Sequence, residues 1–81
     1  LHVNNNIVNL ILENKLFDHN WLKKAKEYLD RNLKLMNNVN ESCYRRIRAQ
    51  TWLLYAKINL IENDCDLAYE CILKCIKIQS L

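Results

Sequence analysis

AQTWLLYAKINLIENDCDLAYECILKCIKIQS, residues 49–80, is the stretch that decides the fold of this chain. Apolar residues follow helical spacing on both sides of a polar break at Asn63 and Asp64. This pattern predicts two helices joined by a short turn. Large Trp52 and Tyr55 precede small Ala56 in the first helix, and small Ala68 opens the apolar row of the second. Two antiparallel helices that pack closely need large and small side chains in this kind of order.

The same order resembles the tetratricopeptide repeat, whose pattern is W-x2-L-G-x2-Y…A-x3-F…P over a unit of about 34 residues. The match is good over 49–80 and weak over 7–37. The residues at the family's packing positions are Trp52, Tyr55, Ala56, Ala68, Ile72 and Cys75. The resemblance implies a short piece of a right-handed solenoid, whose units form binding surfaces and are rarely catalytic.

Three positions depart from the family pattern. Asn63 stands where glycine often closes the turn, and asparagine tolerates the left-handed conformation that this position requires. Ser80 replaces the terminal proline, and Asn59 replaces an aromatic residue. We expect Asn59 either to loosen the packing toward a following repeat or to face a groove. Helical-hairpin arrays of giant lipid-kinase-like protein kinases, of separase and of the cohesin loader look similar, and these residues do not choose among them.

The rest of the chain predicts a second, weaker hairpin. We expect Leu1–Asn6 to be a frayed or loop-like end, a first helix from Ile7, and a second helix over 21–36. Asp18 or Asn20 is expected to cap the second helix, and Asn40 or Ser42 the third. Asp64 or Asp66 is expected to cap the fourth. The resulting division is a first hairpin over 7–37, a linker with an extended start of the third helix over 38–48, and a second hairpin over 49–80.

The chain also repeats itself. The segment AKEYLDRNLKLMN, which begins at Ala25, aligns with AYECILKCIKIQS, which begins at Ala68, and each would be the second helix of a hairpin. The offset of 43 residues exceeds the length of a regular unit, and the excess lies around Asn37–Arg48, in the linker and the extended start of the third helix. The sequence therefore predicts an irregular helical repeat with all four helices in one domain over 1–81.

Composition favours this all-α prediction. The 81 residues contain no glycine and no proline, which β-hairpins and loop-rich folds use heavily, and 51% of them are apolar. No apolar run approaches the roughly 18 residues of a membrane helix, and no secretory signal is visible. Four cysteines without disulfide-scaffold spacing favour reduced thiols, so we expect an intracellular protein, cytoplasmic or nuclear, with no membrane partner. Without an initiator methionine, the chain is expected to be a fragment of a longer protein.

Positive charge gathers in the middle of the chain, where residues 21–48 hold eight Lys and Arg against three Asp and Glu. The candidate partner-binding residues are Lys23, Lys24, Lys26, Arg45, Arg46 and Arg48. Such groups are an ordinary solvated helix face, a site for an acidic protein segment, or phosphate contacts for nucleic acid. All three interpretations stay open, with the solvated face favoured.

No motif for catalysis, cofactor or metal binding is apparent. Cys71 and Cys75 are four residues apart on one helix and could supply two zinc ligands, but no further ligands lie nearby in sequence. Cys75 is better explained as a small packing residue, and Cys71 is expected to be partly exposed. Trp21 and Trp52 are expected to be core anchors, one in each hairpin.

These observations predict a non-enzymatic protein–protein interaction scaffold that binds a peptide, a helix or a partner subunit. A basic helical module that binds nucleic acid is the first alternative. A small helical dimerisation or adaptor domain is the second.

Overall fold

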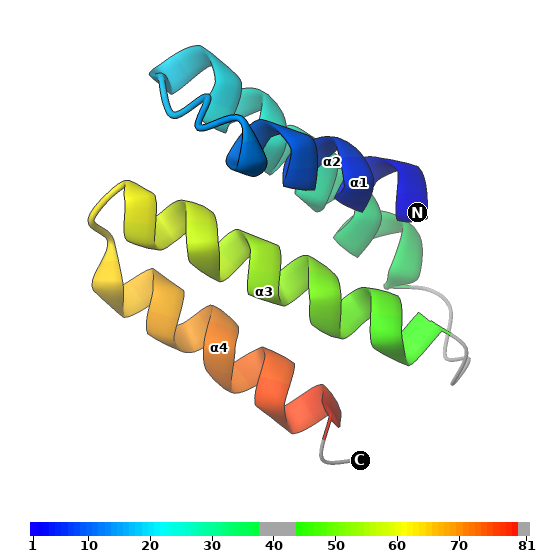
Figure 1. The fold of residues 1–81 in the computed structure, drawn as a ribbon. Coiled ribbons are helices and arrows are strands. Elements are labelled where there is room, and N and C mark those ends of the chain that lie inside the picture. The colour runs from blue at the N-terminus through cyan, green and yellow to red at the C-terminus, as the bar shows by residue number, and fades with distance from the viewer. Residues whose placement is uncertain (38–43, 80–81) are drawn as a thin grey trace.

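The computed structural model describes residues 1–37 and 44–79, and within these ranges the chain is all-helical with no strand. The four helices are α1 (His2–Glu13), α2 (His19–Met36), α3 (Arg45–Ile61) and α4 (Cys65–Gln79). Figure 1 shows α1 antiparallel to α2, and α3 antiparallel to α4. The prediction of an all-α chain with four helices is therefore confirmed. The expected caps Asn40 and Ser42, and residue 80, lie outside the described residues.

Each hairpin turn contains one residue in the left-handed conformation. Asn63 has φ 62° and closes the turn between α3 and α4, as the sequence predicted. Lys15 has φ 54° and closes the turn between α1 and α2, although it is neither glycine nor asparagine. In both turns the amide of this residue and the following amide donate to carbonyl groups of the preceding helical turn, at 2.8 to 3.2 Å. This is the Schellman arrangement, which satisfies carbonyls that the helix end leaves free.

Aspartate caps the second helix of each hairpin. The Asp18 carboxylate accepts from the amide of Trp21 at 3.0 Å, and the Asp64 carboxylate accepts from the amide of Leu67 at 3.3 Å. Both residues were among the predicted caps. The two hairpins nevertheless differ in length, because Lys15 precedes buried Ala25 by ten residues and Asn63 precedes buried Ala68 by five. The sequence pattern did not predict this second irregularity.

The expectation that Leu1–Asn6 forms a frayed or loop-like end is wrong, because α1 begins at His2. Tertiary hydrogen bonds hold this end in place. The Asn32 amide on α2 donates to the carbonyl of Leu1 at 2.9 Å, and the Asn4 amide donates to the Asn32 side-chain carbonyl at 2.8 Å. Periodicity of apolar residues cannot reveal a helical turn that polar side chains anchor.

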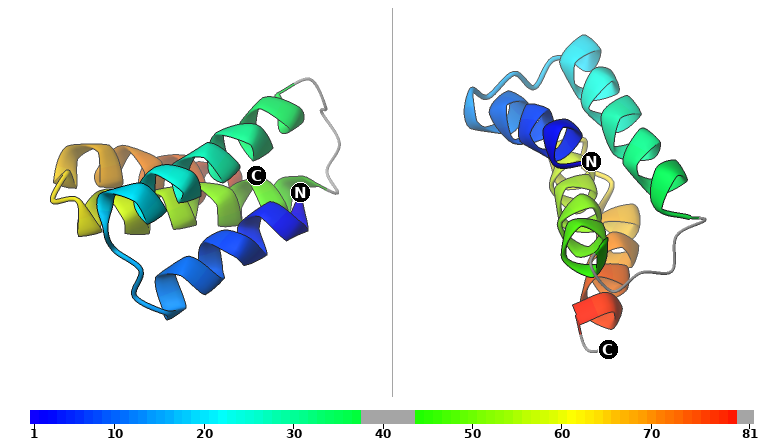
Figure 2. Two further views of the ribbon diagram at one scale, coloured as in Figure 1. Left: turned by 90° about the horizontal axis from the view of Figure 1, so that it is seen from above. Right: turned by 90° about the vertical axis from the view of Figure 1, so that its right-hand side faces the viewer.

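The main core lies between the first hairpin and α3. Figure 2 shows α3 in the middle of the molecule, with α1 and α2 on one side and α4 on the other. The buried cluster contains Val8, Ile11, Leu22, Ala25, Leu29, Leu54 and Ile58, so it draws on α1, α2 and α3 together. This arrangement places α3 against both helices of the first hairpin, with the core shared among them.

Small side chains lie between α3 and α4, the pair of helices with the most extensive contact. Ala56, Ala68 and Cys75 are all buried there. Asn59, whose place the sequence left open, is also buried, and its amide donates to the Cys71 sulfur at 3.5 Å. Asn59 therefore faces α4. The expectation that Cys71 is partly exposed is wrong, because Cys71 is buried under this amide.

Three buried polar side chains join α1, α2 and α3. The Asn32 amide donates to the Asn5 side-chain carbonyl at 2.9 Å, and the Thr51 hydroxyl lies 3.1 Å from the same oxygen and 2.8 Å from the carbonyl of Ile47. Asn5, Asn32 and Thr51 are all completely buried. Because a hydrogen bond depends on position more strictly than an apolar contact does, these bonds fix how the three helices lie relative to one another.

The two tryptophans are less buried than a core anchor would be. Trp21 is 40% exposed, so its expected role as the core anchor of the first hairpin is wrong. Adjacent Leu22 is buried instead, and Trp21 lies under the Lys24 ammonium at 5.6 Å from its ring centroid. Trp52 is half-buried and packs beside Tyr55, with the Lys74 ammonium 4.2 Å from its ring centroid.

Candidate interaction surfaces

Two of the six candidate basic residues bind the ends of neighbouring helices. The Arg45 guanidinium, in the first turn of α3, donates to the carbonyls of Ile78 and Gln79 at 2.8 and 2.9 Å. The Arg48 guanidinium donates to the carbonyl of Met36 at 3.1 Å. Because a helix C-terminus carries unsatisfied carbonyls and partial negative charge, both arginines stabilise it. The start of α3 thus holds the ends of α2 and α4.

The lysines of α2 form a separate group with mixed roles. Lys26 forms an ion pair with Glu62, the C-cap of α3, and Lys24 lies over the Trp21 ring. Lys23 is exposed. Lys26 of α2 therefore lies near the C-terminal end of α3, whereas Arg45 lies at its N-terminal end. The two ends of this 17-residue helix are about 25 Å apart. The two basic groups do not form one continuous surface.

The predicted repeat-packing residues come from both helices of the second hairpin. Ala56, Ala68 and Cys75 are buried, while Tyr55 and Ile72 are half-buried like Trp52. Tyr55 also packs against the core that the first hairpin shares with α3. These residues therefore lie inside the fold or at its edge, and the exposed surface is made by others.

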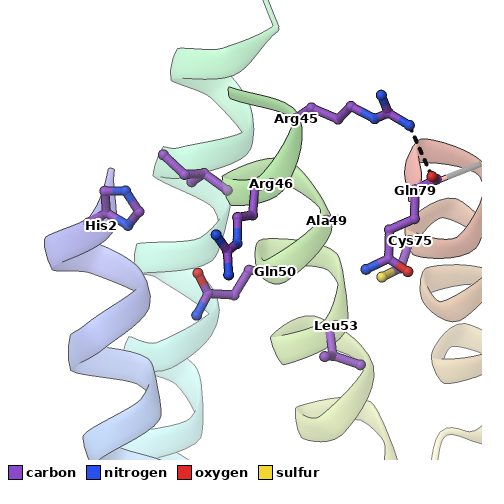
Figure 3. A pocket seen from close by; sticks show the side chains of 9 residues that line it. His2, Arg45, Arg46, Ala49, Gln50, Leu53, Cys75 and Gln79 are labelled. Atoms are coloured by element: carbon purple, nitrogen blue, oxygen red, sulfur yellow. Dashed lines mark hydrogen bonds between the residues drawn. The ribbon is translucent and has the colours of Figure 1, made fainter. Parts of the chain in front are cut away.

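A shallow groove of about 830 Å³ lies over the first half of α3. Figure 3 shows its two walls, with His2 of α1 on one side and Cys75 and Gln79 of α4 on the other. Arg46, Gln50 and Leu53 of α3 make its floor. Arg45 and Arg46 both line this groove; Arg45 donates to the carbonyls of Ile78 and Gln79, whereas Arg46 is exposed. The groove can accept an extended or helical segment with an acidic group near Arg46.

A second surface is apolar and lies along the outer side of α3 and α4. Its members are Leu53 and Leu60 of α3 and Tyr69, Leu73 and Ile76 of α4, which are between 42% and 63% exposed. We refer to these five residues as the outer apolar face. Neither the helical pattern nor the family resemblance singled them out, because the sequence alone does not tell which of the many apolar positions are left uncovered.

Tyr55 connects α3 to α2 through its hydroxyl group, which donates to the Asp30 carboxylate at 3.0 Å. Burial, the Asp30 hydrogen bond and the Asp30 charge raise the pKa of Tyr55 from 10.0 to about 12. All of these effects favour the protonated form in the folded state.

The raised pKa predicts a loss of stability at high pH. Because the folded chain keeps the Tyr55 proton after the unfolded chain has lost it, the contribution of this group is complete below pH 10 and falls as pH rises toward 12. We expect the difference in unfolding free energy between the wild type and Tyr55→Phe to shrink between pH 8 and pH 11. Denaturant titrations at both pH values measure it, and a constant difference would contradict the assignment.

Among the described residues, no group of three or more histidine, cysteine, aspartate or glutamate side chains is placed to hold a metal ion. Burial raises the pKa of the Cys71 thiol, which keeps it protonated and makes it a poor nucleophile. Cys65 is exposed, and none of Cys65, Cys71 and Cys75 is bonded to another. Within the same residues, no helix is both long enough and apolar enough to cross a membrane.

Comparison of the chain with protein-family models, with curated protein sequences and with solved structures finds no match in any of the three.

Proposed function

We propose that the chain is a non-enzymatic protein–protein interaction scaffold, a tetratricopeptide-like segment of a helical-repeat solenoid that acts in the cytoplasm or the nucleus. The observation that carries this proposal is that the first hairpin already packs against a third helix, α3. The helix α3 lies against both α1 and α2, and the three share one core. The second hairpin has the same Schellman turn, and five of its six exposed large apolar side chains make up the outer apolar face.

The chemistry of the side chains supports a binding role in preference to a catalytic one. Among the residues that the structure describes, Tyr55 and Cys71 are the groups with shifted pKa values, and both shifts are due first to burial. Both make hydrogen bonds that join helices, Tyr55 with Asp30 and Cys71 with Asn59. Groups of this kind stabilise packing and do not provide a nucleophile or a base.

The roles of the basic residues also favour a protein partner over nucleic acid. Arg45 and Arg48 bind helix ends, and Lys26 is paired with Glu62. Arginines that already donate to helix ends have fewer N–H donors left for phosphate contacts, and the Glu62 carboxylate offsets the charge of Lys26. Arg46 remains exposed in the groove, where a single arginine suits one acidic group of a peptide.

Site-directed photo-crosslinking tests the proposal. A photoreactive residue replaces Gln50 in the groove, Leu73 on the outer apolar face, or Leu35, an exposed leucine of α2 that serves as the control. The protein is irradiated in an extract of its own source cells after nuclease treatment. We expect discrete protein adducts from position 50 or position 73 and none from position 35.

Two results would contradict the scaffold proposal. The first is an absence of protein adducts at both positions, together with binding to a short duplex or single strand whose affinity falls steeply with salt concentration, which favours the nucleic-acid alternative. The second is an adduct only to another copy of the chain, with a sedimentation coefficient that rises with concentration. That result favours a dimerisation domain.

A further inference from the structure

The outer apolar face forms a row on each of two adjacent helices. Leu53 and Leu60 are seven residues apart on α3, and Tyr69, Leu73 and Ile76 are spaced by four and three on α4, so each set lies on one side of its helix. Leu53 borders the groove beside Gln79, which is one helical turn from Ile76. The two rows therefore follow the same seam between α3 and α4.

The row on α3 corresponds to residues of α1 that bind a helix. The two left-handed turn residues, Lys15 and Asn63, are 48 residues apart, which aligns Asn5 with Leu53 and Leu12 with Leu60. Asn5 lies within hydrogen-bonding distance of Thr51 of α3, and Leu12 packs on the core cluster that α3 shares. Asn5 and Leu12 of α1, which lie at the contact with α3 and its core, therefore correspond to Leu53 and Leu60 of α3, which are exposed.

The row on α4 corresponds in the same way to residues of α2. Ala25 and Ala68 are both buried and 43 residues apart, which aligns Lys26 with Tyr69 and Asp30 with Leu73. Lys26 pairs with Glu62 at the end of α3, and Asp30 accepts the hydroxyl of Tyr55 of α3. Where the first hairpin reaches α3 with charged groups, the second hairpin presents apolar groups at equivalent positions.

We infer that the outer apolar face binds an amphipathic helix of another polypeptide, seated as α3 is seated on the first hairpin. This inference rests on the proposed scaffold function and names the site and the class of partner. The side of α3 that contacts the first hairpin carries Thr51, Leu54 and Ile58, a spacing of three and four residues. The partner helix carries small or aliphatic side chains at this spacing.

The charge around the face adds a second requirement. Lys57 is exposed on α3 between Leu53 and Leu60, and Arg46 is exposed about two turns before Leu53 on the same side of the helix. Two cations at the border of an apolar row attract carboxylates and disfavour a basic partner. The partner helix therefore carries Asp or Glu beside its apolar row.

A second copy of the chain is a poorer occupant of this face. The offset of 48 residues aligns Val3, Asn6 and Leu10 of α1 with Thr51, Leu54 and Ile58 of α3. Val3 and Leu10 are exposed and apolar, but Asn6 would bring a polar amide where α3 has a leucine. A buried amide without a partner disfavours binding, so a helix with an apolar residue at this position binds better.

A peptide with the sequence of residues 45–62 and the substitutions Arg48→Glu and Lys57→Glu serves as the probe, so that acidic side chains flank its apolar row. Its helix is fixed by a hydrocarbon staple in place of Arg46 and Gln50, which lie outside the row of Thr51, Leu54 and Ile58. Fluorescence anisotropy measures its binding to the full 81-residue chain. We expect saturable binding that Leu73→Asp weakens about tenfold, because a buried leucine side chain is replaced by a charge. Leu53→Asp combined with Leu73→Asp is expected to abolish binding, and Leu35→Asp is expected to leave the affinity unchanged.

Circular dichroism first establishes that each variant is folded. Affinity that is equal in the wild type and in Leu73→Asp would overturn the inference, because the peptide would then have exchanged with α3 in the first hairpin. An absence of saturable binding would also overturn it. Self-association of the chain that both Leu73→Asp and Leu10→Asp abolish would identify a second copy as the occupant and overturn the choice of partner. In the photo-crosslinking experiment, protein adducts from position 50 but not from position 73 would exclude the outer apolar face as the binding site. The proposed scaffold function would then still hold.

Discussion

Replacing Leu29 with alanine is expected to lower the free energy of unfolding by about 3 to 4 kcal/mol, because the residue is central to the core. Leu29 is completely buried in the cluster that α1, α2 and α3 share. Truncation removes apolar contacts on several sides and leaves a cavity that helices held by other contacts cannot close. Since a small domain has a total stability of roughly 5 to 15 kcal/mol, a large part of it would be lost.

Urea titration followed by circular dichroism measures this effect, with Leu35→Ala as the matched control. Leu35 is on the same helix and is 61% exposed, so its truncation is expected to change the unfolding free energy by less than about 0.5 kcal/mol. Comparable losses for the two variants would show that α2 does not bury the side that contains Leu29.

The second large effect is expected at Asn32, whose buried side chain has three hydrogen-bond partners. Its amide donates to the carbonyl of Leu1 and to Asn5, and its carbonyl accepts from Asn4. Asn32→Leu keeps a side chain of similar size but leaves these three groups without their partner. We expect a loss of about 3 kcal/mol, since each buried group left unsatisfied costs roughly 1 to 3 kcal/mol and the groups near the N-terminus can reach water.

A double-mutant cycle separates this cause from a general packing defect. Asn5→Leu combined with Asn32→Leu removes both partners of their shared hydrogen bond, so the double variant is expected to lose less stability than the sum of the single variants. Asn6→Leu is the control, because Asn6 is exposed on the same helix as Asn5. Strictly additive losses would mean that the hydrogen bond contributes nothing to stability.

Much of the fold could be predicted from local chemistry. Helical periodicity predicts four helices, and the cap at Asp18 and the left-handed turn at Asn63 follow from the preferences of those side chains. Trp21 shows the limit of periodicity. Two adjacent large residues straddle the edge of a helix face, and only the packing of α1 and α3 decides that Leu22 is buried and Trp21 is not.

The candidate site was harder to predict because it depends on what the rest of the chain leaves uncovered. Arg45 and Arg48 form part of a basic cluster in the sequence, but the ends of α4 and α2 are brought next to them only by the fold. Leu53 and Leu60 follow the same helical spacing as core residues. Their exposure becomes apparent only when α3 is seen to use its other two sides for packing.

The use of α3 on several sides has a consequence for evolution. One side of α3, with Leu54 and Ile58, is constrained by the first hairpin, and another, with Ala56 and Asn59, is constrained by α4. Substitutions on these two sides of α3 disturb the packing of the fold before they alter what the surface binds. Only the remaining side, which includes Leu53, can vary while the architecture is kept. A lineage can therefore alter what this surface recognises through a few changes on one side of one helix, and inherit the rest of the molecule unchanged.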